Sequence, residues 1–250
     1  MKPSQDIQDL CRAFLHGLNA ALGDRLYGVY LYGAVAFPGS SPTGDIDFHV
    51  ILKDPLGDQE RSEIHWLHMR LARDFPPFGG ELDGYYILLE EARQASLPRD
   101  QLRAHVVDNA WALHREHIRA GRCIVLQGPD PTQVYPAASW PELERALHGE
   151  LKYVEKHLDV YPDYCILNLC RLVYSFEARD VVISKAEAAA WAWDVFPQWR
   201  RHIETAKKSY ARQATAQDVA FMRCEVNHLF RFACERIRGT RSNRSANRSL

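Results

Sequence analysis

Two short apolar runs, joined by a loop rich in glycine, proline and serine, constrain this chain most. The first, residues 26–32, ends at Gly33, and the second, residues 46–52, alternates apolar and polar positions. Alternation with a period of two is typical of a β-strand with one buried face. The two runs therefore predict two strands, and the polar positions of the second must share one face of it.

The polar face of the second strand begins with Asp45 and Asp47. These two carboxylates project together and repel each other unless a cation lies between them. Carboxylate oxygens suit Mg²⁺, and a glycine at a strand end leaves backbone N–H groups open to a phosphate. Together, the glycine turn and the aspartate pair predict a site for a metal-bound triphosphate. Taken alone, each feature would be read as an ordinary solvated turn.

Composition sets wide bounds on the function of this chain of 250 residues. Its formal net charge of −1 gives no overall electrostatic attraction to nucleic acid or to a membrane. Six cysteines are scattered without a C-x-x-C pair, and neither a signal peptide nor a long apolar span is evident. We therefore expect reduced thiols, a cytoplasmic location, and no nucleic-acid or membrane partner.

The first half of the chain combines helical and strand patterns. Helices are predicted over 5–22, 34–37, 59–74 and 103–119, and strands over 26–32, 46–52, 81–89 and 123–126. In the third strand, Glu81 and Asp83 share a face, so either could add a third carboxylate as a metal ligand or a base. Either could equally be a polar residue that only begins the strand.

The second half shows only helical periodicity. A proline-rich stretch over 128–141 predicts a linker. Helices are expected over 141–158, 164–178, 185–195, 199–211 and 217–237. Ser184 and Glu187 form a capping-box pattern. The predicted fold is an α/β (α+β) domain with a mixed sheet over 1–135, an all-α helical bundle over 136–238, and a disordered tail over 239–250.

Two patterns together resemble a known family. The glycine turn followed by D-x-D resembles the signature of the polymerase-beta-like nucleotidyltransferases. In the helical half, YCILNLCRLVYSFEARDVVISKAEAAAWAWD resembles the adenylyltransferases that modify streptomycin and spectinomycin. The resemblance implies Mg²⁺-dependent transfer of AMP from ATP to a hydroxyl of an aminoglycoside or aminocyclitol. It also implies a monomer whose partners are ATP and a small cationic acceptor, with the active site in a cleft between the two domains.

The resemblance assigns the catalytic carboxylates. In this family a carboxylate at the start of an alternating strand is the catalytic base, and the segment LDGYYILLEEA places that match on Asp83, with Glu81 as the fallback. Asp45, Asp47 and Asp83 would then hold the metal.

The resemblance also assigns a nucleotide site to residues of both halves. They are Gly33, Ala34, Asp130, Arg171, Lys185 and Tyr210. A guanidinium and an ammonium group would offset the charge of the triphosphate. A structural salt bridge at Arg171 and a plain turn at Asp130 are the alternatives.

For the acceptor, the resemblance points to Asp163, which lies beside Tyr161 and Tyr164. An acidic, partly aromatic surface suits a polycationic sugar. Trp111 could stack on a sugar ring, although its spacing fits a helix core equally well.

The chain departs from the family pattern at two positions near the phosphates. Ala34 and Gly44 stand where the family has serines. The hydroxyls of Ser40, Ser41 or Thr43 could substitute for them. Two other functions therefore stay open: nucleotidyl transfer to another small molecule or a protein, and a nucleotide-binding relative with weak or no catalysis.

Overall fold

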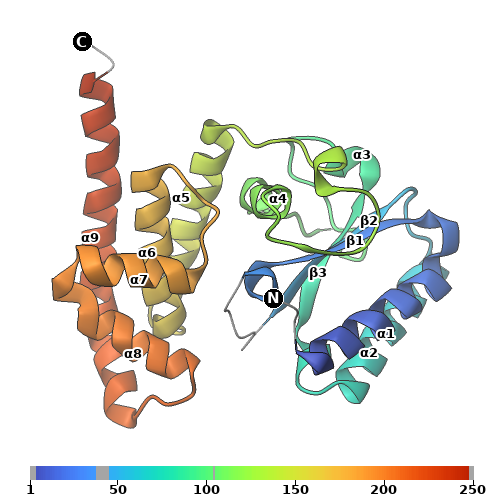
Figure 1. Ribbon diagram of the computed structural model, residues 1–250, viewed down its shortest axis with the longest axis horizontal. Helices are drawn as coiled ribbons and strands as arrows, with labels where there is room; N and C mark the ends of the chain where they lie inside the picture. Colours follow the sequence, from blue (N-terminus) through green and yellow to red (C-terminus); the bar gives the residue numbers. More distant parts are fainter. Residues whose placement is uncertain (1–3, 38–44, 104, 248–250) are drawn as a thin grey trace. The chain divides into compact units, whose positions relative to one another are not determined.

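The computed structural model describes residues 4–37, 45–103 and 105–247, with side chains described as far as residue 240. It divides the chain into two compact units, Met1–Ser139 and Trp140–Leu250 (Figure 1). The expected boundary at 135/136 lies in the same proline-containing stretch as the division after Ser139.

The first unit is built on a mixed sheet. Its strands are β1 (Leu26–Tyr32), β2 (Ile46–Leu52), β3 (Leu82–Leu88) and β4 (Ile124–Gln127). The order is β3-β2-β1-β4; β1 pairs antiparallel with β2 and β4, whereas β2 and β3 are parallel. The predicted strands and the mixed sheet are confirmed.

Helices cover both faces of this sheet (Figure 1). One face packs against α1 (Gln5–Leu22) and α2 (Asp58–Asp74), and the other against α4 (Trp111–Arg119) and the short α3 (Leu89–Ala92). Among its described residues, the unit also contains 3-10 turns at Gly23–Arg25, Gly33–Ala36, Phe78–Gly80 and Pro131–Gln133.

The alternation along β2 sorts its side chains between two cores. Ile46, Phe48 and Val50 belong to the core under α1 and α2. On the opposite face, Ile51 joins a core around Trp111, and His49 is fully buried. The polar positions of β2 therefore do not all face water, and only the end with Asp47 is partly exposed.

The predicted helix over 103–119 was wrong in its first half. The helix begins at Trp111, and the preceding segment is irregular apart from a bridge between Arg99 and Val107. Asp108 explains the difference, because its carboxylate accepts a hydrogen bond from Ala110 N (3.0 Å) just before the helix. Aspartate favours such positions over helix interiors.

The second unit consists, within its described residues, of helices and turns alone, as predicted. The helices are α5 (Trp140–His157), α6 (Pro162–Ala178), α7 (Lys185–Val195), α8 (Arg200–Tyr210) and α9 (Ala216–Asn247), with a 3-10 turn at Pro197–Trp199. The central helix, α6, packs against the other four, and its buried face carries Leu169, Leu172 and Phe176.

The end of the chain differs from the expected disordered tail. The backbone of α9 continues past Gly239 to Asn247. The stretch contains no proline to end the helix, and its arginines and alanine have good helix propensity.

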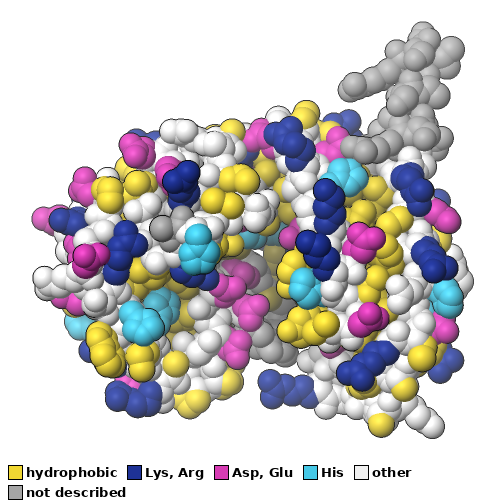
Figure 2. All heavy atoms as spheres, turned by 180° about the vertical axis from the view of Figure 1, so that it is seen from behind, with side chains coloured by type: hydrophobic (Ala, Val, Ile, Leu, Met, Phe, Trp, Pro, Cys, Tyr) yellow, Lys and Arg dark blue, Asp and Glu magenta, His cyan; other side chains and the backbone are white. Residues whose placement is uncertain are grey.

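The surface carries charges of both signs. Figure 2 shows Lys and Arg side chains intermixed with Asp and Glu over the face in view, in keeping with the net charge of −1. Within the described part of the chain, no helix has both the length and the apolar character needed to cross a membrane.

The capping box at the start of α7 gives a test of the second unit. Ser184 Oγ accepts from Glu187 N (3.0 Å), and Glu187 Oε2 accepts from Ser184 N (2.9 Å). Ser184→Ala should lower the free energy of unfolding by about 1 kcal/mol, measured by urea denaturation. Ser184→Thr, which keeps the hydroxyl, should lose clearly less; equal losses would show that the cap contributes nothing.

Candidate functional site

Three neighbouring strands bring polar side chains to one level of the first sheet. Asp47 of β2 pairs with Asp83 of β3 in the parallel register, and Tyr32 of β1 lies opposite Asp47 on its other side. Paired residues in adjacent strands lie about 5 Å apart and point to the same face. Asp45 directly precedes β2 and is exposed. Asp47 and Asp83 therefore lie side by side on adjacent strands, and Asp45 directly precedes the first of these.

Gly33 is fitted to the carboxylate of Asp47. Its φ of 69° is in the left-handed region, and a Cβ added there would lie 1.8 Å from Asp47 Oδ2. Only glycine permits this approach of a backbone to a carboxylate. Ala34 follows in the 3-10 turn Gly33–Ala36. The predicted substitutes for its missing hydroxyl, Ser40, Ser41 and Thr43, lie with Gly44 outside the described residues.

Arg103 is a cation beside Asp83 that the sequence analysis missed. Arg103 Nη1 lies 3.9 Å from Asp83 Oδ1, and Arg103 Nη2 donates to Gly84 O (2.7 Å). A further ion pair to the buried Asp100 holds the guanidinium in place. This contact was not predicted, because residue 103 was expected to begin a helix, whereas the helix begins at Trp111. Because Asp83 and Arg103 are both largely exposed, water weakens their attraction.

Glu81 stands just outside the ladder that holds Asp83. Its backbone carbonyl accepts a hydrogen bond from Ile46 N (2.7 Å), one step before the first paired residues of β2 and β3. Glu81 is exposed, as Asp83 is. Register therefore puts Asp83, rather than Glu81, directly beside Asp47.

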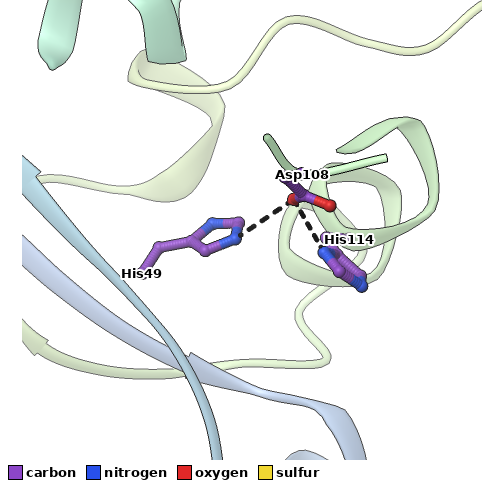
Figure 3. A group of neighbouring side chains, drawn as sticks. All are labelled: His49, Asp108 and His114. Atoms are coloured by element: carbon purple, nitrogen blue, oxygen red, sulfur yellow. Dashed lines mark hydrogen bonds and ion pairs between the residues drawn. The ribbon is translucent and has the colours of Figure 1, made fainter. Parts of the chain in front are cut away.

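A second polar group lies buried on the same face, further along β2. It consists of His49, Asp108 and His114 (Figure 3). Asp108 Oδ2 lies 2.8 Å from His114 Nδ1 and 3.6 Å from His49 Nε2. Tyr32 connects this group to the aspartates, because its hydroxyl lies 3.2 Å from His114 Nδ1 while its strand position faces Asp47. The apolar periodicity of the helix predicted over 103–119 gives His114 only a core position.

Burial decides the ionisation in this group. It lowers the pKa of His49, and the neighbouring Asp108 offsets only part of that effect. Burial would raise the pKa of Asp108, but His114 and His49 outweigh it and hold this pKa well below its usual range. Burial, with the charges of Asp47 and Asp108, raises the pKa of Tyr32 well above its ordinary value. At neutral pH, His49 and Tyr32 are therefore neutral and Asp108 is charged.

In the second unit, predicted nucleotide residues lie together at the start of α7 and the end of α8. Lys185 Nζ lies 4.1 Å from the centroid of the Tyr164 ring and 3.5 Å from Tyr210 Oη. A lysine held over two aromatic rings keeps its charge in a defined place. Ser209 Oγ donates to Asp163 Oδ2 (2.6 Å), which ties the first turn of α6 to the same end of α8.

Arg171 joins this group through Glu150. Arg171 Nη2 lies 3.8 Å from Glu150 Oε2, and Asn168 Nδ2 lies 3.3 Å from both Glu150 Oε2 and Tyr164 Oη. The salt bridge is the one that the sequence left open as an alternative role for Arg171. Glu150 was missed because it is one of several glutamates on α5, and periodicity does not single it out.

Two predicted residues have structural contacts of their own. Trp111 is fully buried, and its Nε1 donates to Gln94 O (3.0 Å), so the core alternative describes its position. Asp130 is exposed and accepts from Thr132 N (2.8 Å) and Thr132 Oγ1 (2.5 Å), as a turn aspartate does. These hydrogen bonds from Thr132 lower the pKa of Asp130.

Comparisons with known proteins find similarity in sequence and in fold. Residues 133–236 match the C-terminal domain of the aminoglycoside adenylyltransferases. The spectinomycin 9-adenylyltransferase of Enterococcus faecalis is 21% identical over 219 residues, covering 77% of this chain and 83% of that protein.

A solved structure shares the fold. It is the spectinomycin adenyltransferase AAD(9) of the same organism, solved with ATP and spectinomycin. The TM-score is 0.74 at 17% identity, and the match covers 92% of this chain and 99% of the other. Residues 133–236 are thus similar to the C-terminal domain of the aminoglycoside adenylyltransferases, and the sequence relative and the shared fold agree with that similarity.

Proposed function

We propose that this enzyme transfers AMP from ATP, with Mg²⁺, to a hydroxyl of a cationic aminocyclitol or aminoglycoside, with spectinomycin and streptomycin as the first candidates. The observation that carries the proposal is the pairing of Asp47 with Asp83 across β2 and β3, with Gly33 against Asp47. The solved relative bound to ATP and spectinomycin supports the choice of substrates.

The donor set suits Mg²⁺. Asp45, Asp47 and Asp83 offer only carboxylate oxygens, which are the ligands that this hard cation prefers. When bound, Mg²⁺ would neutralise charge on the phosphates and on the departing pyrophosphate. The partly exposed Asp47 and the exposed Asp45 and Asp83 leave room for the phosphates of a nucleotide at this edge of the sheet.

Asp83 is the proposed base. The acceptor hydroxyl loses its proton as its oxygen attacks the α-phosphorus of ATP, and the bond to pyrophosphate breaks. A carboxylate within about 2.6–3.2 Å of that hydroxyl can take the proton. The Arg103 guanidinium lies beside Asp83, and its contact with Gly84 O keeps it at the strand end.

The second unit is proposed to bind the nucleotide through Arg171, Lys185 and Tyr210. The ammonium of Lys185 lies over the rings of Tyr164 and Tyr210, which places a positive charge where it could bind a phosphate. Asp163 and Glu150 supply negative charge for the amino groups of an acceptor. Asp130 stays a weaker candidate for a nucleotide contact, because its carboxylate already accepts a hydrogen bond from Thr132 Oγ1.

Two further readings differ from this proposal in specific ways. Another acceptor, such as a different small molecule or a protein hydroxyl, would keep the metal site and change only the acidic surface. A weak or non-catalytic nucleotide-binding relative would follow if Ala34 leaves the phosphates poorly held. A monomer in the cytoplasm is our expectation, and the six unpaired cysteines suit a reducing compartment.

Pyrophosphate release tests the proposed function directly. With ATP and Mg²⁺, the enzyme should release pyrophosphate only when an acceptor such as spectinomycin or streptomycin is added. Asp47→Asn removes one charge from the metal site at nearly constant volume and should reduce turnover to background while leaving the circular dichroism spectrum unchanged. Near-normal Mg²⁺-dependent turnover in this variant would show that the metal lies elsewhere.

Asp83→Asn separates a base from a metal ligand. If Asp83 chiefly accepts the proton, kcat should fall by about 10²–10⁴-fold, while the affinity for ATP with Mg²⁺, measured by calorimetry, should change little. A large loss of nucleotide affinity would indicate a ligand role instead. Glu81→Gln is the matched control, and a dead Glu81→Gln beside an active Asp83→Asn would reverse the choice.

Arg171→Ala tests the nucleotide site of the second unit. A charge-assisted hydrogen bond contributes about 1.5–3 kcal/mol, so loss of Arg171 should weaken ATP binding by about tenfold or more. It should also reduce the rise in melting temperature that ATP with Mg²⁺ produces. Arg145→Ala, at an exposed position of α5, is the control and should leave both values unchanged. Equal behaviour of the two variants would assign Arg171 to its salt bridge alone.

A further inference from the structure

We propose that His49, Asp108 and His114 form a binding site for one divalent transition-metal ion of the Zn²⁺ class, distinct from the carboxylate site for Mg²⁺. Each side chain offers one ligand atom, and these atoms all lie within 4.8 Å of one another. Figure 3 shows the two imidazole rings turned towards the carboxylate of Asp108 from opposite sides.

The chemistry of the three ligands selects the class of metal. Two imidazole nitrogens and one carboxylate oxygen are a common ligand set for Zn²⁺, Co²⁺ and related ions, whereas Mg²⁺ prefers oxygen alone. Around a tetrahedral ion at about 2.0–2.2 Å, ligand atoms lie about 3.3–3.6 Å apart. The separation of 3.6 Å between His49 Nε2 and Asp108 Oδ2 fits this value. The 2.8 Å contact of His114 Nδ1 with Asp108 Oδ2 is a hydrogen bond that an ion would replace.

His49 is the independent sign of a missing ligand. The residue is fully buried, yet within the described part of the chain neither ring nitrogen has a partner at hydrogen-bond distance, and Nε2 has only the carboxylate of Asp108 at 3.6 Å. A buried polar group left without a partner is costly and uncommon. Asp108 Oδ2, its nearest charged neighbour, already contacts His114 at the shorter distance. An ion between the three side chains would satisfy His49 without breaking the aromatic packing around it.

The surroundings allow an ion to enter and to be held. The His114 side chain is 24% exposed, which gives one approach from the surface, whereas His49 and Asp108 are closed off. Aromatic rings of Tyr32, Trp111 and Tyr135 surround His49 at centroid distances of 4.6–5.8 Å and exclude water from the inner side. The Tyr32 hydroxyl, 3.2 Å from His114 Nδ1, or a water molecule would complete the coordination.

The position of the site suggests what the ion would do. His49 lies on β2 two residues after Asp47, while Asp108 and His114 come from the irregular segment before α4 and from α4 itself. One ion would therefore fasten this irregular segment to the strand that carries the proposed Mg²⁺ ligand. Its role would be structural, because it would hold the segment before α4 against β2, with Tyr32 between the ion and Asp47.

Cobalt binding tests the proposal on the full chain. After treatment with a chelator, Co²⁺ should bind in a ratio of one per chain in the presence of excess Mg²⁺. Nitrogen ligands at low coordination number should give intense visible absorption bands, which added Zn²⁺ should remove. At free Zn²⁺ about 100-fold above its Kd, the melting temperature should rise by about 5 °C or more.

Variants identify the ligands. His114→Gln, at the partly exposed position, should abolish the bands, and His49→Gln should do so where it folds. His117→Gln, on the same helix and also buried, should keep them, and so should Asp47→Asn. Absence of the bands together with absence of a Zn²⁺-dependent shift would overturn the proposal. So would bands that survive in His114→Gln and disappear in Asp47→Asn, because the ion would then lie in the carboxylate site.

Discussion

The close approach of Asp47 to Gly33 is the constraint on which the first unit depends. A carboxylate can lie against the end of β1 only where no Cβ is present. The antiparallel register of β1 with β2 then sets Asp47 opposite Tyr32, and the parallel register of β2 with β3 adds Asp83 on the other side. The contact between Gly33 and Asp47 thus lies in the middle of a row of polar side chains, Tyr32, Asp47 and Asp83, that crosses three strands.

The second unit places its charges by a different principle. There, one buried helix, α6, organises the others, and the polar residues that matter lie where neighbouring helices meet it. Lys185 begins α7 after a capped turn, and Arg171 leaves α6 towards Glu150 of α5. Because each cation is tied to a partner within the same unit, its charge is positioned before any ligand arrives, which reduces the ordering that binding would require.

Sequence periodicity predicted the strands and most helices because each amphipathic face had a core to bury. Residues 46–52 alternate because β2 separates two cores, and D-x-D stands at the strand end where the burial stops. Periodicity left open a salt bridge at Arg171, but it could not predict Glu150 as the partner, or Arg103 as the partner of Asp83. These contacts join segments whose separation in sequence carries no pattern. The spacing of Trp111 fitted either a core residue or a ring that stacks on a sugar, because periodicity does not tell whether a buried side chain packs in a core or contacts a ligand.

The segment before α4 shows most clearly why the remaining features escaped. Read as apolar periodicity, residues 103–119 form one helix with His114 on its core side. The structure instead uses Asp108 to end an irregular segment, because its carboxylate bonds Ala110 N while its other oxygen faces two histidines. The buried carboxylate of Asp108 before α4 depends on tertiary structure, because it is stabilised only when His49 of a distant strand lies beside it. Local propensity therefore missed both the helix boundary and the polar group, and for the same reason.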